Sequence, residues 1–449
     1  MAKQGSLGKK LVFHLVLFGF IGQLAWAVEN VVFNTFLFNY IGGTTRDISR
    51  MVALSAVTAV VTTFIMGTLS DKCGRKLFLA GGYLLWGVVV MLFGGISRDS
   101  VARIFSLTDE AAVVTLTVTL VIALDCLMTF MGSTANDAAF SAWVTENTLP
   151  ENRGKAEGLM SLFPVFATGV TMGLFGLVGS ALTYPMFFVG LGALVTLSGI
   201  VGLLTLKETA APALQEGSYF ANLFYGFRPS VIRENAKLYR ILLACGISGI
   251  ALQIFFPYLF IYIQHFLLKP ADPGAESGFQ ITPAIIVLAV VAVAGIVAIA
   301  VGAGVILDKF GKRPFLYPSI AVMLLTLAAA YFPRSLVGFL PLGVVAFAAN
   351  AFLGMILGAT IRDLTPEGKA GQFQGVRMIF FVLLPMVIGP VLGNAVIEFF
   401  AKNHSAGTYI NEFGSAVLVP VPEIFPAAAI AAALMILPLL KNPIAKKEK

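Results

Sequence analysis

Long apolar stretches follow one another along almost the whole chain, and short polar segments separate them. A helix of about 20 apolar residues is long enough to cross a hydrocarbon core of roughly 30 Å. The pattern predicts twelve membrane-spanning helices, at residues 11–41, 49–69, 77–96, 111–145, 158–181, 184–206, 239–267, 283–307, 314–332, 336–360, 375–399 and 422–440. We therefore expect an all-α membrane protein.

The polar segments that follow the second and eighth spans share one charged pattern, G-x-x-x-D-x-x-G-[RK]-[RK]. It is found at 67–76 and again at 304–313. A carrier built from two similar halves needs equivalent joints, so the repeat predicts two pseudo-symmetric six-helix bundles. We expect an N-terminal bundle at 1–206, an interfacial cytoplasmic linker at 207–238, and a C-terminal bundle at 239–449. The linker mixes aromatic residues with arginine, which is typical of a segment lying on the inner leaflet.

Composition and charge exclude a soluble protein. Of 449 residues, 58% are hydrophobic and 12% are charged, against roughly 25% charged in soluble domains. Lys3, Lys9 and Lys10 precede the first span, and the basic loops fall on the same side, so both termini are expected in the cytoplasm. The net charge of +7 then reflects anionic lipid and not nucleic acid. The three cysteines form no spaced pair, and we expect no metal site.

Each copy of the charged pattern has a physical rationale. Its second glycine permits a tight turn, and its aspartate can pair with a cation or a helix N-terminus. We interpret Asp71, Arg75, Asp308 and Arg313 as a conformational latch that stabilises one access state. The alternative is that the loops only orient the chain in the membrane.

Ionisable groups within spans cost at least roughly 2.5–3.5 kcal/mol each and usually mark a transport path. In the first span, helical spacing aligns the polar residues Gln23, Trp26, Asn30 and Asn34, with Glu29 at the margin of the stripe. In the fourth, steps of four residues align Asp125, Thr129, Ser133, Asp137 and Ser141. The two stripes predict walls of one wet cavity, in which Glu29, Asp137 and Asp125 bind the coupling cation.

Amide and aromatic side chains suit a hydroxylated substrate, because amides both donate and accept and rings pack against sugar faces. The predicted substrate-binding residues are Trp26, Asn30, Asn34, Asn136, Phe140, Gln253, Tyr258 and Asn350. Structural alternatives stay open. Asp125 and Trp26 suit helix packing equally well, and Gln253 and Asn350 could make interhelical hydrogen bonds.

The duplicated pattern, with Arg153-Gly154 after the fourth span, resembles the major facilitator superfamily across the whole chain. Within it, 18–23, 136–140 and 363–367 resemble the glycoside–pentoside–hexuronide cation symporters, the melibiose permease-like group. This resemblance implies alternating access and the coupled transport of a sugar with a cation. In that group an aspartate occupies the position of Leu24, and acidic cation ligands occupy the second span near Ala59 and Thr63. These departures argue against Na⁺ binding in this chain through the ligands that the group uses.

The sequence also separates classes of function. It contains no G-x-x-x-x-G-K-[ST] phosphate loop and no nucleophile–histidine–acid group, so we expect neither an enzyme nor a cofactor. We predict a secondary transporter, a monomer in a bacterial inner membrane, that carries a sugar or glycoside in symport with H⁺ rather than Na⁺. A proton-coupled exporter of amphipathic small molecules is the main alternative. A receptor or lipid-scrambling protein is a third.

Overall fold

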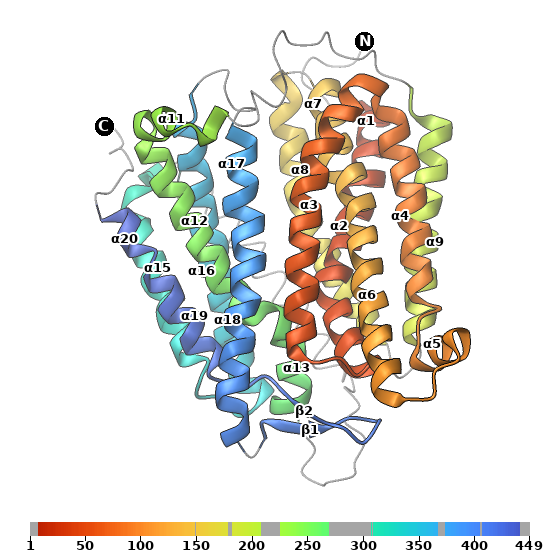
Figure 1. The fold of residues 1–449 in the computed structure, drawn as a ribbon. Helices are drawn as coiled ribbons and strands as arrows, with labels where there is room; N and C mark the ends of the chain where they lie inside the picture. Colours follow the sequence, from red (N-terminus) through yellow and green to blue (C-terminus); the bar gives the residue numbers. More distant parts are fainter. Residues whose placement is uncertain are drawn as a thin grey trace. The chain divides into compact units, whose positions relative to one another are not determined.

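The computed structural model describes residues 8–148, 150–177, 182–207, 225–268, 307, 309–366, 373–404 and 406–440. These residues are helical almost throughout (Figure 1). By length and apolar composition, eight of the described helices could cross a membrane on their own, and a bent pair adds a ninth. The prediction of an all-α membrane fold is confirmed.

The described residues cluster into two compact units. The first holds the residues up to Gly43 and those at 57–207. The second holds 44–56 and the described residues from Tyr225 onward. One helix, α3 (Thr45–Cys73), therefore belongs to the second unit at its start and to the first over the rest of its length.

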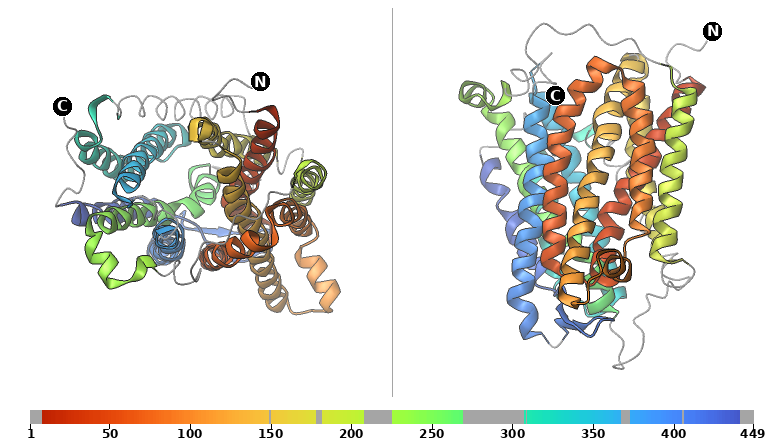
Figure 2. Two further views of the ribbon diagram at one scale, coloured as in Figure 1. Left: turned by 90° about the horizontal axis from the view of Figure 1, so that it is seen from above. Right: turned by 45° about the vertical axis from the view of Figure 1, so that its right-hand side comes forward.

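The first unit contains five of the predicted spans and most of a sixth, α3. Its first span is a continuous run of α1 (Lys9–His14), η1 (Leu15–Phe20), α2 (Ile21–Val28), η2 (Glu29–Phe33) and η3 (Phe36–Tyr40). The later elements are η4 (Leu77–Gly81), α4 (Gly82–Phe93), α5 (Arg98–Phe105), α6 (Glu110–Gly132), η5 (Ser133–Phe140), α7 (Ser141–Asn147), α8 (Pro150–Phe175) and α9 (Tyr184–Thr205). The orange α4 and the yellow-green α9 run side by side (Figure 1, Figure 2).

The second unit begins with η6 (Tyr225–Phe227), α11 (Pro229–Glu234), α12 (Ala236–Phe255), η7 (Phe256–Tyr258), α13 (Leu259–Tyr262) and η8 (Ile263–Leu267). Further helices are α15 (Arg313–Ala329), α16 (Leu336–Leu364), α17 (Gln374–Met378), η10 (Ile379–Leu383), α18 (Leu384–Phe400), η11 (Ala401–Asn403), α19 (Ile424–Ala433) and α20 (Ile436–Leu439). The predicted span at 283–307 lies outside the described residues, apart from Leu307.

Several spans deviate from regular α-helix, and two of these deviations carry acidic side chains. Segments η2 and η5 are π-helical, and they contain Glu29 and Asp137 respectively. A π turn inserts an extra residue into the helix, and such turns often occur at functional sites. The residues predicted to form one stripe in the fourth span therefore do not all share a face. Asp125, Thr129 and Ser133 are buried, whereas Ser141 is exposed.

A short β-hairpin was not predicted. Strands β1 (Thr408–Ile410) and β2 (Ala416–Leu418) pair antiparallel, with Tyr409 opposite Val417. The connecting turn includes Gly414, whose φ of +73° lies in the left-handed region that favours glycine. The hairpin follows α18 in the loop before the last span, at the end of the second unit opposite to α11 (Figure 1).

Candidate functional site

The acidic residues of the first and fourth spans lie together within the first unit. Thr129 Oγ1, on α6, donates a hydrogen bond to Glu29 Oε1, on η2, at 3.3 Å. Asp125 and Asp137 are both close enough to Glu29 to interact with it electrostatically. Three carboxyl groups from two helices therefore form one cluster, which we call the acidic cluster.

Hydroxyl groups support the acidic cluster from the fourth span. Ser133 Oγ donates to Asp137 Oδ2 at 2.9 Å, one step along the helix from the Thr129–Glu29 contact. Asp125 is 1% exposed, whereas Glu29 and Asp137 are partly exposed. Asp125 is thus the most deeply buried of the three residues, and Glu29 Oε2 is buried as well.

Several buried polar atoms around the acidic cluster have no hydrogen-bond partner among the described residues. They are Trp26 Nε1, Glu29 Oε2, Asn34 Oδ1 and Trp86 Nε1. Buried polar atoms in native proteins are nearly always paired, so a concentration of unpaired ones indicates a place for water, a proton or a ligand. Trp26 and Trp86 also contact each other, with ring centroids 5.2 Å apart, and Trp86 is fully buried.

The amide groups predicted to bind substrate are largely engaged within the protein. Asn30 Nδ2 donates to the carbonyl oxygen of Trp26 at 2.8 Å, and Asn34 Nδ2 donates to that of Asn30 at 3.1 Å. Phe140 is 6% exposed and stacks on Trp143, with centroids 6.3 Å apart. These contacts leave Asn30 and Asn34 fewer groups to offer a ligand and place Phe140 in the packing.

Asn136 joins three spans and is 5% exposed. Its Nδ2 donates to the hydroxyl oxygen of Tyr83 at 2.6 Å and lies 3.4 Å from the carbonyl oxygen of Phe18. The Tyr83 hydroxyl in turn donates to the same Phe18 carbonyl. Gly22 makes this approach possible, because a Cβ atom there would lie 2.2 Å from Asn136 Nδ2. The geometry gives Asn136 a bracing position between helices.

Predicted substrate residues in the second unit have different environments. Tyr258 is fully buried and donates to the carbonyl oxygen of Pro390 at 2.7 Å. Gln253 is partly exposed, and its stem packs over Gly389. Asn350 Oδ1 accepts a hydrogen bond from Ser248 Oγ at 3.2 Å. Asn350 also lines a pocket.

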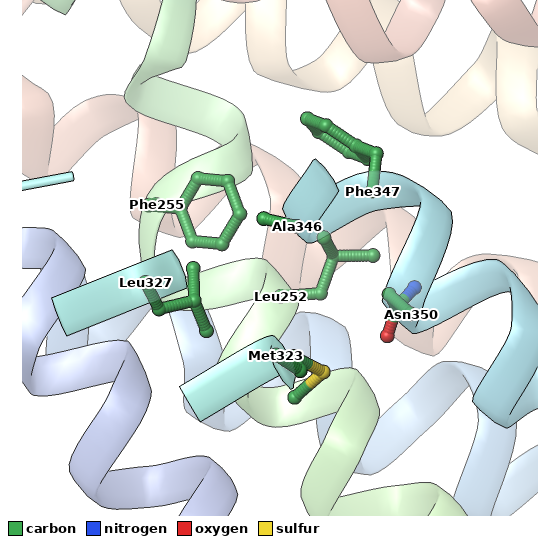
Figure 3. Close-up of a pocket in the computed structure, with 7 residues that line it drawn as sticks. All are labelled: Leu252, Phe255, Met323, Leu327, Ala346, Phe347 and Asn350. Carbon is green, nitrogen blue, oxygen red and sulfur yellow. The ribbon is translucent and has the colours of Figure 1, made fainter. Parts of the chain in front are cut away.

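That pocket lies within the second unit, between α12, α15 and α16, and is nearly all apolar (Figure 3). Its empty space, including the open mouth, is about 240 Å³. It is lined by Leu252, Phe255, Met323, Leu327, Ala346, Phe347 and Asn350. The Asn350 amide is the one polar side chain among these lining residues, so the wall of the pocket offers a single hydrogen-bonding group.

The two charged loops form ion pairs through the residue that follows the second glycine. In the first copy, Arg75 donates to Glu146 Oε1 through Nε at 3.0 Å and Nη2 at 2.8 Å, and its Nη1 donates to Ser70 Oγ at 2.6 Å. In the second copy, Lys312 pairs with Asp363. The partners Glu146 and Asp363 end the fourth and tenth spans, so the pairs occupy equivalent positions.

The latch prediction therefore covered only part of this arrangement. It included Arg75 but missed Lys312, Glu146 and Asp363. Arg313 begins α15, and the side chain of Asp71 and all of Asp308 lie outside the described part of the chain. The tight turns are as predicted, since Gly74 and Gly311 have φ values of 93° and 80°. The sequence did carry a signal for these partners. An acidic residue ends the fourth span in the first half, and another ends the tenth span in the second half.

Apolar helices make up both units, and the first unit encloses a buried acidic cluster, which is the arrangement of a multi-pass membrane transporter and not of an enzyme. The chain belongs to the Major Facilitator Superfamily, whose model matches residues 15–390. No curated protein sequence matches the chain. This match identifies the superfamily and does not identify the melibiose permease-like group within it.

Solved transporters share the fold. The nucleoside transporter NupG superimposes with a TM-score of 0.68 at 13% identity, covering 96% of this chain and 98% of its own. A bacterial homolog of the human lysosomal transporter Spinster, inward-facing and occupied, gives a TM-score of 0.65 at 14% identity, covering 99% and 100%. At such identities the likeness establishes the fold alone.

Proposed function

We propose that this transporter couples the movement of an amphipathic small molecule to that of protons, and that Glu29, Asp125 and Asp137 carry the proton. The observation behind the proposal is the acidic cluster, which joins carboxyl groups from the first and fourth spans. Three carboxylates this close repel one another in a low-dielectric interior, and a bound cation offsets that repulsion.

A proton suits this cluster better than a metal cation. Glu29 Oε2 is a buried acceptor without a described partner, and a proton needs only one such oxygen. The hydroxyl groups of Thr129 and Ser133 already donate to one oxygen each of Glu29 and Asp137. The residues Glu29 and Asp137 keep some exposed surface, and buried Asp125 adds repulsion that favours proton uptake.

Two observations support an amphipathic substrate. Asn30, Asn34 and Asn136, which would bind sugar hydroxyl groups, donate instead to acceptors of the protein itself. The surface beside Asn350 has six apolar side chains to one amide, so it offers few hydrogen-bonding groups to a sugar ring.

A sugar or glycoside, carried in symport, is the second candidate. It is supported by the partly exposed side chains of Gln23, Trp26 and Asn30, which lie on one span. The indole ring could pack against a sugar face while the amide oxygens accept hydroxyl protons. Thermal-shift measurements with tetraphenylphosphonium and with methyl galactoside separate the candidates. Stabilisation by tetraphenylphosphonium alone supports the amphipathic substrate. Stabilisation by the galactoside alone supports the sugar.

Proton coupling is tested in proteoliposomes with the stabilising compound as substrate. We expect an imposed pH gradient to drive accumulation by the wild-type protein. Glu29→Gln and Asp137→Asn should each reduce that accumulation at least about tenfold, because an amide cannot release a proton at neutral pH. Exchange of labelled for unlabelled substrate needs no net proton movement, so it should persist in both variants.

The matched control is Asp99→Asn, which neutralises an exposed carboxyl group on α5. It should leave gradient-driven accumulation within about twofold of wild type. Full accumulation by both cluster variants would refute the assignment of the proton site. Equal loss of accumulation and exchange would show that the variants damage substrate binding instead.

A further inference from the structure

The segment that leads into the second unit is fixed against its helices. The hydroxyl group of Tyr239, on α12, donates to the carbonyl oxygen of Gly226 in η6. The ring of Tyr225 meets that of Phe373 edge-on, with centroids 6.2 Å apart. Val231 of α11 is buried. Residues 225–240 therefore form a defined surface.

The outward side of this segment combines cations with an apolar side chain. Arg228, Ile232, Arg233 and Lys237 are exposed, and we call them the basic face. Across 225–240 there are four cations, with Arg240 the fourth, and one carboxylate, Glu234. Within the described ranges, Arg228, Arg233 and Lys237 form no ion pair with an acidic residue.

The position of the basic face relates it to the membrane surface. The apolar span Ala236–Leu267 begins directly after α11, and α11 lies across the end of α12 (Figure 1). The basic face is therefore at the depth where a span enters the bilayer. Phosphate headgroups occupy that depth, and an exposed isoleucine among cations is typical of an interfacial helix.

We propose that the basic face binds the headgroups of anionic phospholipids, with Ile232 inserted between them. Charge complementarity supports this ligand, because cations close to a bilayer surface attract anionic lipids and do not attract zwitterionic ones. The contact would hold the start of the second unit against one leaflet. It is independent of the proton site and of the transported molecule.

Native mass spectrometry of the full-length protein tests the proposal, with phosphatidylglycerol and phosphatidylcholine as probes. We expect the wild-type protein to prefer phosphatidylglycerol and to lose the preference as salt is raised. The triple variant Arg228→Gln, Arg233→Gln, Lys237→Gln should weaken phosphatidylglycerol binding roughly tenfold or more, since each cation contributes a few-fold. Phosphatidylcholine binding should not change.

The matched control neutralises three exposed cations elsewhere, Arg50→Gln, Arg103→Gln and Lys402→Gln. It should keep the lipid preference of wild type, and an equal loss in both triple variants would overturn the proposal. A second measurement avoids charge changes: a nitroxide attached to Ile232→Cys, with the native cysteines replaced by serine. In anionic vesicles the label should be relaxed more by oxygen than by a water-soluble nickel complex. Stronger relaxation by the nickel complex would place residue 232 in water and refute the proposal. A soluble anionic partner in place of lipid would give that same result.

Discussion

Asn136 shows how a polar residue within a membrane span can serve structure. Sequence reasoning grouped it with the substrate-binding residues because it adjoins Asp137 in a polar span. Its hydrogen bonds to Tyr83 and Phe18 connect the first, third and fourth spans. No sequence pattern reveals this, because the partners lie 53 and 118 positions away and the contact depends on the absence of a side chain at Gly22.

We predict that Gly22→Ala destabilises the protein. The added Cβ would lie 2.2 Å from Asn136 Nδ2 and 2.3 Å from the Tyr83 hydroxyl oxygen, so both side chains must move. Overpacking of this kind typically costs about 1–3 kcal/mol. The midpoint of thermal unfolding in detergent should fall by several degrees.

Gly173→Ala provides the control for that substitution. Gly173 lies within α8, and a Cβ there would meet nothing within 4 Å. Alanine is the better helix former by about 1 kcal/mol, so the midpoint should stay the same or rise. A similar fall in both variants would contradict the bracing position of Asn136.

At the scale of elements, the apolar runs located eight membrane-length helices and a bent pair in the described part of the chain, whereas 314–332 and 422–440 correspond to shorter apolar helices. Long runs such as 111–145 and 336–360 correspond to the helices Glu110–Asn147 and Leu336–Leu364. The π turns could not be predicted, because one inserted residue leaves the apolar pattern of a buried helix unchanged. The hairpin at 408–418 was missed because its strands have three residues each, too few for an alternating pattern.

The two loop ion pairs should differ in strength. The side chains of Arg75 and Glu146 are 7% and 20% exposed, and Arg75 makes three hydrogen bonds. Breaking this partly buried pair from one side should cost more than the about 0–1 kcal/mol of an exposed pair, because the less exposed Arg75 charge is left without its partner. We predict that Glu146→Gln strongly lowers the unfolding midpoint. It should also speed maleimide labelling of Cys73, the exposed cysteine that ends α3.

The Lys312–Asp363 pair gives the comparison within the same molecule. The side chain of Asp363 is 65% exposed, and exposed pairs contribute about 0–1 kcal/mol. Asp363→Asn should therefore change the midpoint little. If Glu146→Gln and Asp363→Asn lowered the unfolding midpoint equally, the difference in burial would not determine the strength of the two ion pairs.

At the scale of the whole molecule, α3 is notable because its two parts belong to different units. Its first turn contacts α18: Thr45 Oγ1 donates to Asn394 Oδ1 at 2.8 Å, and Arg46 donates to Glu398 Oε1 through Nε at 3.0 Å and Nη2 at 2.7 Å. Alternating access requires helices to exchange contacts. Both contacts lie within the second unit, so they tie the start of α3 to that unit while the rest of the helix belongs to the first.

We predict that a disulfide between Thr45→Cys and Asn394→Cys, in a protein whose native cysteines are serine, stops substrate exchange. Their side chains are in hydrogen-bond contact, so oxidation should join them readily. Reduction should restore exchange to the level before oxidation. The single variants, treated identically, are the controls. Exchange that continues with the disulfide formed would show that this contact persists through the transport cycle.

The π-helical segment η5 has a consequence for how the acidic cluster could respond to its proton. An α-helix turns through about 100° per residue. If a π turn converts to a regular α turn, the helix on one side of it therefore rotates by about that angle relative to the other side. Relaxation of η5 to regular helix would rotate Asp137 about the helix axis relative to Asp125, together with the part of the span that follows it. The span could thus act as a swivel joint, carrying one carboxyl group away from its neighbours without tilting the helix.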